Sequence, residues 1–212
     1  MRCECFVLAA GKSSRFGDVK SLALTAKGDA LLAEVATTLS NSPFGKPTLV
    51  LAQPHISHIS KALSDAFTTL DISEGLSPEA GLGDSIAATV ASVRTDTTHA
   101  LLVLGDQIGL TNDDYRGLWH AFNASPEKIH CAISDAGLSP PVIFPRAYFD
   151  QLRQLSGERG AKALLNQLPE AVQPFAMASA AIDIDTPAQL ARWNQQHSVS
   201  QKEGVSHDQL NH

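Results

Sequence analysis

Short apolar runs alternate with stretches of helical periodicity along most of this chain, and this alternation constrains the fold more than any other feature. The expected strands are 3–9, 48–52, 70–72, 100–104, 129–133, 142–144 and 180–184. The expected helices are 29–39, 55–67, 84–93, 147–155 and 161–168, with two more that begin at Thr111 and at Pro187. Such alternation predicts an α/β domain with a mostly parallel sheet and helices on both faces.

The length of 212 residues suits one domain of this kind. From about His197 the sequence becomes polar and loses its periodicity. We therefore predict a single domain over 1–196 and a polar, mobile tail over 197–212.

Charge and hydropathy indicate which partners and which compartment to expect for this protein. The formal net charge of −6 argues against general attraction to a nucleic-acid backbone. The sequence contains no apolar run of 18 residues, so no membrane span is expected. The N-terminus leads directly into an apolar strand without a signal-peptide cleavage region, which predicts a cytoplasmic protein.

The loop after the first expected strand carries a dense group of small, polar and basic residues. Gly11 and the small residues before it allow backbone N–H groups to approach an anion, and Ser13 and Ser14 add hydroxyl donors. Arg15 can bind two phosphate oxygens, and Lys20 supplies a point charge. Because the spacing fits neither the P-loop nor the dinucleotide-binding fingerprint, the loop is either another phosphate-binding loop or an ordinary turn with two solvated cations.

A carboxylate follows the most hydrophobic expected strand. Asp106 comes directly after 100–104 and Gly105. A deeply placed carboxylate needs a partner, and Mg²⁺ bound to a triphosphate requires only one or two protein carboxylates. Asp106 is thus a candidate magnesium ligand, and its alternative role is to cap the next helix.

The first loop, with the pattern L-A-A-G-x-S-x-R-x-G-x-x-K, resembles that of the MobA-like nucleotidyltransferases, which have a Rossmann-like fold of the glycosyltransferase-A type. The resemblance implies that the loop holds a nucleoside triphosphate, with Arg15 and Lys20 neutralising the phosphates. Ala-Ala-Gly stands where the guanylyl branch usually has Ala-Gly-Gly, so the loop is similar to that of the molybdenum cofactor cytidylyltransferases and implies CTP. The expected nucleotide contacts here are Leu8, Ala9, Ala10, Gly11, Ser13 and Ser14.

Two further segments resemble the metal-binding motifs of this family. Gly105-Asp106-Gln107 matches G-D-Q-P with Ile108 in place of proline, which implies that Asp106 holds Mg²⁺ and that Gln107 contacts the nucleotide. Residues 183–187 match D-I-D-T-P, which implies a second metal ligand. We favour Asp185, nearest the strand end, over Asp183, although Asp185 can also cap the last helix.

The segment 81–86 resembles the turn that contacts the base and ribose in these enzymes. Gly81, Gly83 and Ser85 are the expected contacts, although a glycine-rich helix start is by itself common. Asp84 replaces a residue that is often small and uncharged in relatives, and it would repel a polyanion unless it is turned away.

On the acceptor side, 140–144 and 157–165 resemble the family's P-P-x-x-F and G-D-R-G-A-R-x-L-L segments. Pro141, Arg159 and Lys162 are the expected acceptor contacts, with both cations near the acceptor's phosphate. The alternative is a solvated helix start with two exposed cations.

The resemblance implies a Mg²⁺-dependent enzyme that transfers CMP from CTP, or a nucleotide from another triphosphate, to a molybdopterin-type acceptor. A molybdoenzyme that receives the product is an implied partner. The alternatives are transfer to another acceptor, such as a sugar phosphate, and a non-catalytic chaperone that binds molybdenum cofactor.

Overall fold

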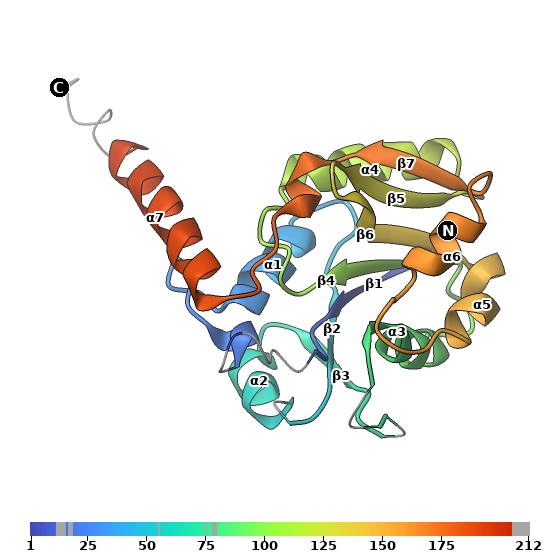
Figure 1. Cartoon of the computed structure of the whole chain (residues 1–212), viewed down its shortest axis with the longest axis horizontal. Helices are drawn as coiled ribbons and strands as arrows, with labels where there is room; N and C mark the ends of the chain where they lie inside the picture. Colours follow the sequence, from blue (N-terminus) through green and yellow to red (C-terminus); the bar gives the residue numbers. More distant parts are fainter. Residues whose placement is uncertain (12–15, 17–18, 55, 75, 78–79, 205–212) are drawn as a thin grey trace.

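The structure is a computed structural model that describes residues 1–11, 16, 19–54, 56–74, 76–77 and 80–204 (Figure 1). The strands are β1 (Cys3–Leu8), β2 (Thr48–Leu51), β3 (Thr68–Asp71), β4 (His99–Leu104), β5 (Ile129–Ser134), β6 (Gly137–Pro145) and β7 (Val172–Ala176). The α-helices are α1 (Leu31–Ser40), α2 (Ile56–Leu63), α3 (Leu82–Ala91), α4 (Asn112–Ala124), α5 (Phe149–Arg153), α6 (Lys162–Gln167) and α7 (Pro187–Gly204). Short 3-10 helices cover Lys20–Leu22, Arg146–Tyr148 and Ala178–Ala181.

Within the described residues the strands form one seven-stranded sheet in the order β3-β2-β1-β4-β6-β5-β7. β6 runs antiparallel to both of its neighbours, and the other pairings are parallel. Leu8 pairs with Leu104, so the loops that follow β1 and β4 begin at the same edge of the sheet. This register brings the first loop and Asp106 to one place, as expected for parallel strands.

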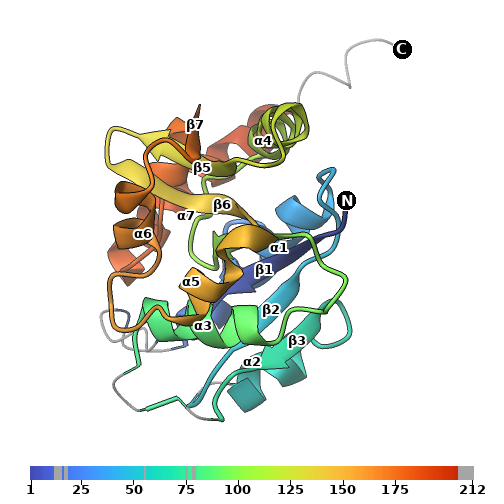
Figure 2. The same cartoon turned by 90° about the vertical axis from the view of Figure 1, so that its right-hand side faces the viewer.

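Helices cover both faces of the sheet (Figure 2). Val7 and Val103 belong to a buried cluster that includes residues of α1, α2 and α4. Phe6 and Leu102 belong to a second cluster, with residues of α3, α5 and α6. Because neighbouring residues of a strand point to opposite faces, the continuous apolar runs of β1 and β4 supply both cores. The predicted α/β class and mostly parallel sheet are confirmed.

The expected last strand, 180–184, is wrong. The strand that completes the sheet is β7, which pairs in parallel with β5, whereas Ala178–Ala181 is a 3-10 helix. β7 carries Pro174 and has no buried residue, so it lacks the apolar pattern of the other strands. Segment 180–184 is apolar for a different reason, because Ala180 and Ile184 are buried in the core without joining the sheet.

α7 extends away from the rest of the domain (Figure 1). It runs to Gly204 and so crosses the predicted boundary between 196 and 197. The mobility of the tail stays a prediction. In the described part of the chain, no helix is long and apolar enough to cross a membrane.

Candidate functional site

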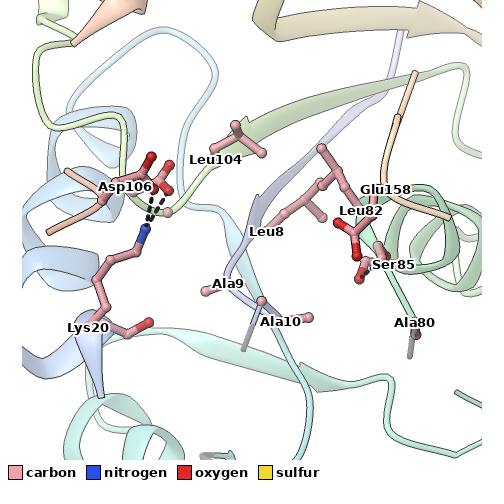
Figure 3. A pocket seen from close by; sticks show the side chains of 15 residues that line it. Leu8, Ala9, Ala10, Lys20, Ala80, Leu82, Ser85, Leu104, Asp106 and Glu158 are labelled. Atoms are coloured by element: carbon pink, nitrogen blue, oxygen red, sulfur yellow. Dashed lines mark hydrogen bonds and ion pairs between the residues drawn. The ribbon is translucent and has the colours of Figure 1, made fainter. Parts of the chain in front are cut away.

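A cavity of about 410 Å³ lies at the carboxyl ends of β1 and β4, where open α/β sheets bind ligands (Figure 3). The residues that line it are Leu8, Ala9, Ala10, Gly11, Lys20, Ser21, Ala80, Gly81, Leu82, Ser85, Leu104, Gly105, Asp106, Glu158 and Asp185. Most of the predicted nucleotide-binding residues are among them. Ser13, Ser14 and Arg15 lie outside the described residues, so their predicted roles stay predictions.

Lys20, one of the two predicted cations, meets both predicted carboxylates in this cavity. Lys20 Nζ lies 2.7 Å from Asp106 Oδ2 and 3.4 Å from Asp185 Oδ1. Figure 3 shows the ammonium group of Lys20 directed at Asp106. The three side chains are 15%, 21% and 25% exposed, in the order Lys20, Asp106 and Asp185. They are therefore shielded enough to interact strongly but remain open to a ligand.

The backbone around Asp106 explains how the last segment reaches the cavity. The carbonyl oxygen of Asp106 accepts hydrogen bonds from the N–H groups of Ile108, at 2.9 Å, and Ile184, at 3.0 Å. The second bond places Asp185 beside the end of β4. Ile108, which replaces the family's proline, is buried, and its N–H makes a bond that proline cannot make.

Thr186, not Asp185, caps α7. The hydroxyl of Thr186 accepts from Gln189 N at 3.3 Å, and Gln189 Oε1 accepts from the N–H groups of Asp185 and Thr186, each at 2.8 Å. This reciprocal pattern is a capping box. The interpretation of Asp185 as the cap is wrong, and its carboxylate lines the cavity instead.

Asp183 faces a different space. It lines a second cavity and not the first. Burial, followed by the neighbouring carboxylates of Asp106 and Asp185, raises the pKa of Asp183. Its position favours Asp185 over Asp183 as the partner of Asp106.

The carboxylate pair suits a magnesium ion. Asp106 Oδ1 is buried and has no hydrogen-bond partner among the described residues, which is costly unless a cation or other ligand binds there. No group of three or more His, Cys, Asp or Glu side chains that could hold a metal occurs in the described part of the chain. Two carboxylates without a protein cage are the arrangement typical of Mg²⁺ that is bound together with phosphates.

The N-terminus of α3 forms the opposite wall of the first cavity. Gly81 is the N-cap residue, and Gly81, Leu82 and Ser85 line the cavity. The positive end of the helix dipole therefore points to where a phosphate can bind. Gly83 was expected to contact the nucleotide, but it lines neither cavity; its N–H donates to Gly157 O at 2.7 Å.

The second cavity, of about 320 Å³, adjoins the first through the shared residues Leu8, Leu82 and Leu104. Its walls are mostly apolar, and Arg159 and Lys162 are its cations. Both were predicted to contact the acceptor, and both are exposed at its border. Pro141 is buried beside this cavity but does not line it, whereas Pro140 does.

Gln107 has a structural position that the sequence did not indicate. It is 2% exposed. Its Nε2 donates to Pro140 O at 2.7 Å and to Ala180 O at 3.0 Å, and its Oε1 accepts from Leu104 N at 3.2 Å. The amide thus joins the end of β4 to β6 and to the 3-10 helix, which form the wall of the second cavity.

Sequence reasoning missed Glu158, which lines the first cavity. The match over 157–165 drew attention to Arg159 and Lys162 on the acceptor side. A turn can direct adjacent residues into different spaces, so the motif alone gave no signal for Glu158.

Comparisons with solved structures find the same fold. Rv0371c from Mycobacterium tuberculosis H37Rv is 23% identical over 92% of this chain and 98% of that chain, with a TM-score of 0.78. A second structure of Rv0371c is a complex with manganese, with a TM-score of 0.74 at 23% identity over 92% of this chain and 99% of that chain.

Two further structures are of synthases. A CMP:2-keto-3-deoxy-manno-octonic acid synthetase complexed with CTP is 14% identical over 94% of this chain and 100% of that chain, with a TM-score of 0.72. The 4-diphosphocytidyl-2C-methyl-D-erythritol synthase from Anaerococcus prevotii DSM 20548 is 13% identical over 92% and 98% of the two chains, with a TM-score of 0.69. At these identities the likeness establishes the fold.

The family itself is established by sequence. A comparison with functionally curated proteins gave no match. The sequence model of the MobA-like NTP transferase domain matches residues 5–172, which is most of the chain. The loop after β1, Asp106 and all the residues that line the first cavity except Asp185 lie inside this match. The chain therefore belongs to the family of MobA-like NTP transferase domains.

Proposed function

We propose that this protein transfers CMP from CTP to the phosphate of a molybdopterin-type acceptor and releases pyrophosphate. The observation that carries the proposal is the meeting of Lys20 with Asp106 and Asp185 in a cavity that adjoins a second, mostly apolar one. The first cavity suits a metal-bound triphosphate, and the second suits an acceptor with a large apolar body.

In this proposal the first cavity positions the triphosphate. Lys20 contributes positive charge at one end, and the N-terminus of α3 contributes the positive end of its helix dipole at the other. Asp106 and Asp185 hold Mg²⁺, which neutralises negative charge on the phosphates when it is bound. The manganese complex of Rv0371c supports a divalent cation in this fold.

The second cavity positions the acceptor. Arg159 and Lys162 lie at its border, where they can neutralise an acceptor phosphate, while its leucine, valine and proline side chains contact the rest of the molecule. An oxygen of that phosphate forms a bond to the α-phosphorus of CTP as the bond to the pyrophosphate oxygen breaks. Because the attacking oxygen is already ionised, no residue has to remove a proton, and the protein contributes position and charge.

The choice of CTP is supported by the Ala-Ala-Gly of the first loop and by the fold shared with a synthetase complexed with CTP. Catalysis is favoured over a chaperone role because neither departure from the family pattern removes a group from the first cavity. Ile108 is buried in the core, and the Asp84 carboxylate binds backbone N–H groups.

Pyrophosphate release tests the proposal. Every reaction contains Mg²⁺ and one of CTP, GTP, ATP and UTP. Each triphosphate is tested with molybdopterin, with a sugar phosphate and with no acceptor. We expect release only with CTP and molybdopterin. Release with a sugar phosphate would identify the other acceptor class, and no release in any combination would favour the chaperone.

A pair of matched lysine variants tests whether the triphosphate binds in the first cavity. Lys20→Met removes the cation that the described residues place in the first cavity, whereas Lys46→Met removes a lysine that lies over the Phe67 ring and lines neither cavity. We expect turnover to fall by about 10²-fold or more in Lys20→Met alone. An equal loss in both variants would contradict the placement of the triphosphate.

A further inference from the structure

The N-terminus of α3 and segment 156–159 pack together through their backbones. A Cβ atom on Gly81 would lie 2.5 Å from the carbonyl carbon of Gly157, and one on Gly83 would lie 2.8 Å from that of Ser156. Both distances are too short for any side chain. Glycine at these two positions therefore permits the close contact between the two backbones, although Gly81 also lines the first cavity.

Asp84 joins the two segments through a single oxygen atom. Its Oδ2 accepts from the N-cap N–H of Gly81 at 2.9 Å and from Gly157 N, also at 2.9 Å. The N–H groups of Gly81 and Gly157 lower the pKa of Asp84, so the carboxylate is ionised at neutral pH. Gly157 has a φ of +70°, a conformation that favours glycine, so the sequence also encodes the turn that presents this N–H.

Successive residues of this segment border different cavities. Glu158 lines the first cavity, near Leu82 and Ser85 (Figure 3). Arg159 lines the second cavity. The placement of both side chains depends on how segment 156–159 is fixed, and Asp84 and Gly83 supply the hydrogen bonds that fix it to α3.

We propose that Asp84 is a positioning residue for both substrates, because it holds segment 156–159 on α3 with Glu158 beside the nucleotide and Arg159 beside the acceptor. The identity of the two substrates rests on the proposed function, but the positioning itself does not. Loss of the Asp84 carboxylate weakens the binding of both substrates while Lys20, Asp106 and Asp185 stay in place.

The test compares Asp84→Ala with Asp84→Asn in the full chain. Asparagine keeps an oxygen that can accept from both N–H groups, whereas alanine keeps none. Asp84→Ser is the second variant if alanine does not fold, because its hydroxyl is too short to reach both donors. Asp113→Ala is the matched control, since Asp113 also lies in the first turn of a helix but pairs with Arg116 of that same helix.

Amide hydrogen exchange, measured by NMR, reports whether segment 156–159 stays hydrogen-bonded to α3, and the measurement needs no substrate. We expect exchange at Gly157 to accelerate about fivefold or more in Asp84→Ala, with Leu102 in β4 unchanged and with Asp84→Asn close to the unsubstituted protein. Unchanged exchange at Gly157 in Asp84→Ala would overturn the proposal.

Steady-state kinetics measure how the loss of the Asp84 carboxylate affects the binding of the two substrates. In Asp84→Ala the KM values for CTP and for molybdopterin rise together, by about fivefold or more, and asparagine restores both. A rise for one substrate only, or an equal rise in Asp113→Ala, contradicts the shared role. If the unsubstituted protein turns over no substrate pair, the proposed function fails, and hydrogen exchange still decides whether Asp84 fixes the segment.

Discussion

Replacing Gln107 with leucine tests whether this residue mainly supports the fold or contacts the nucleotide, as the Gly105-Asp106-Gln107 motif implies. The substitution keeps the volume roughly constant but leaves Pro140 O, Ala180 O and Leu104 N without the partner that the Gln107 amide provides. Each buried group that loses its partner costs about 1–3 kcal/mol. Since the side chain is 2% exposed, water cannot replace the amide without local opening.

The expected loss is about 3–5 kcal/mol, somewhat less than three full penalties because neighbouring groups relax together. For a chain of this size that loss lowers Tm by roughly 10 °C. Urea unfolding followed by circular dichroism measures the free energy, and isothermal calorimetry measures CTP affinity below the transition. A loss under about 1 kcal/mol together with a large fall in CTP affinity would refute the structural role and restore the nucleotide contact.

Three other perturbations have defined outcomes. Asp106→Asn is expected to lower turnover by about 10²–10³-fold with little change in Tm, and retained turnover in the pyrophosphate assay would exclude Asp106 as a metal ligand. Gly83→Ala forces a Cβ atom against the backbone of Ser156 and should lower the free energy of unfolding by about 1–3 kcal/mol in urea, whereas Gly11→Ala, whose new atom has no described residue within 4 Å, should not. Burial lowers the pKa of His130, so the folded state binds its proton less readily than the unfolded state. The contribution of His130 to the free energy of unfolding is fully present above the unfolded pKa of about 6.5 and is lost as the pH falls below it. His130→Gln should therefore make the free energy of unfolding, measured in urea between pH 5 and 8, depend less on pH. An unchanged pH dependence would contradict the assignment.

Much of the candidate site could be predicted because it depends on local sequence and on one rule of topology. Apolar runs mark β1 and β4, and the residues that follow parallel strands meet at one sheet edge. Lys20 and Asp106 follow these strands, so their proximity needed only the order of the elements. The same reasoning failed for β7, whose proline and exposed positions resemble those of a loop, and which is a strand only because β5 offers a free edge.

The sequence by itself determined the α/β class and the place of Asp106 directly after β4, because apolar periodicity and motif spacing are local properties of the chain. Only the tertiary structure decided that Gln107 faces inward, that Thr186 rather than Asp185 caps α7, and that Asp84 binds Gly157, 73 residues away. A polar side chain binds whichever donors and acceptors the fold brings within about 3 Å. Its partners are therefore set by packing between distant segments, which no local pattern specifies.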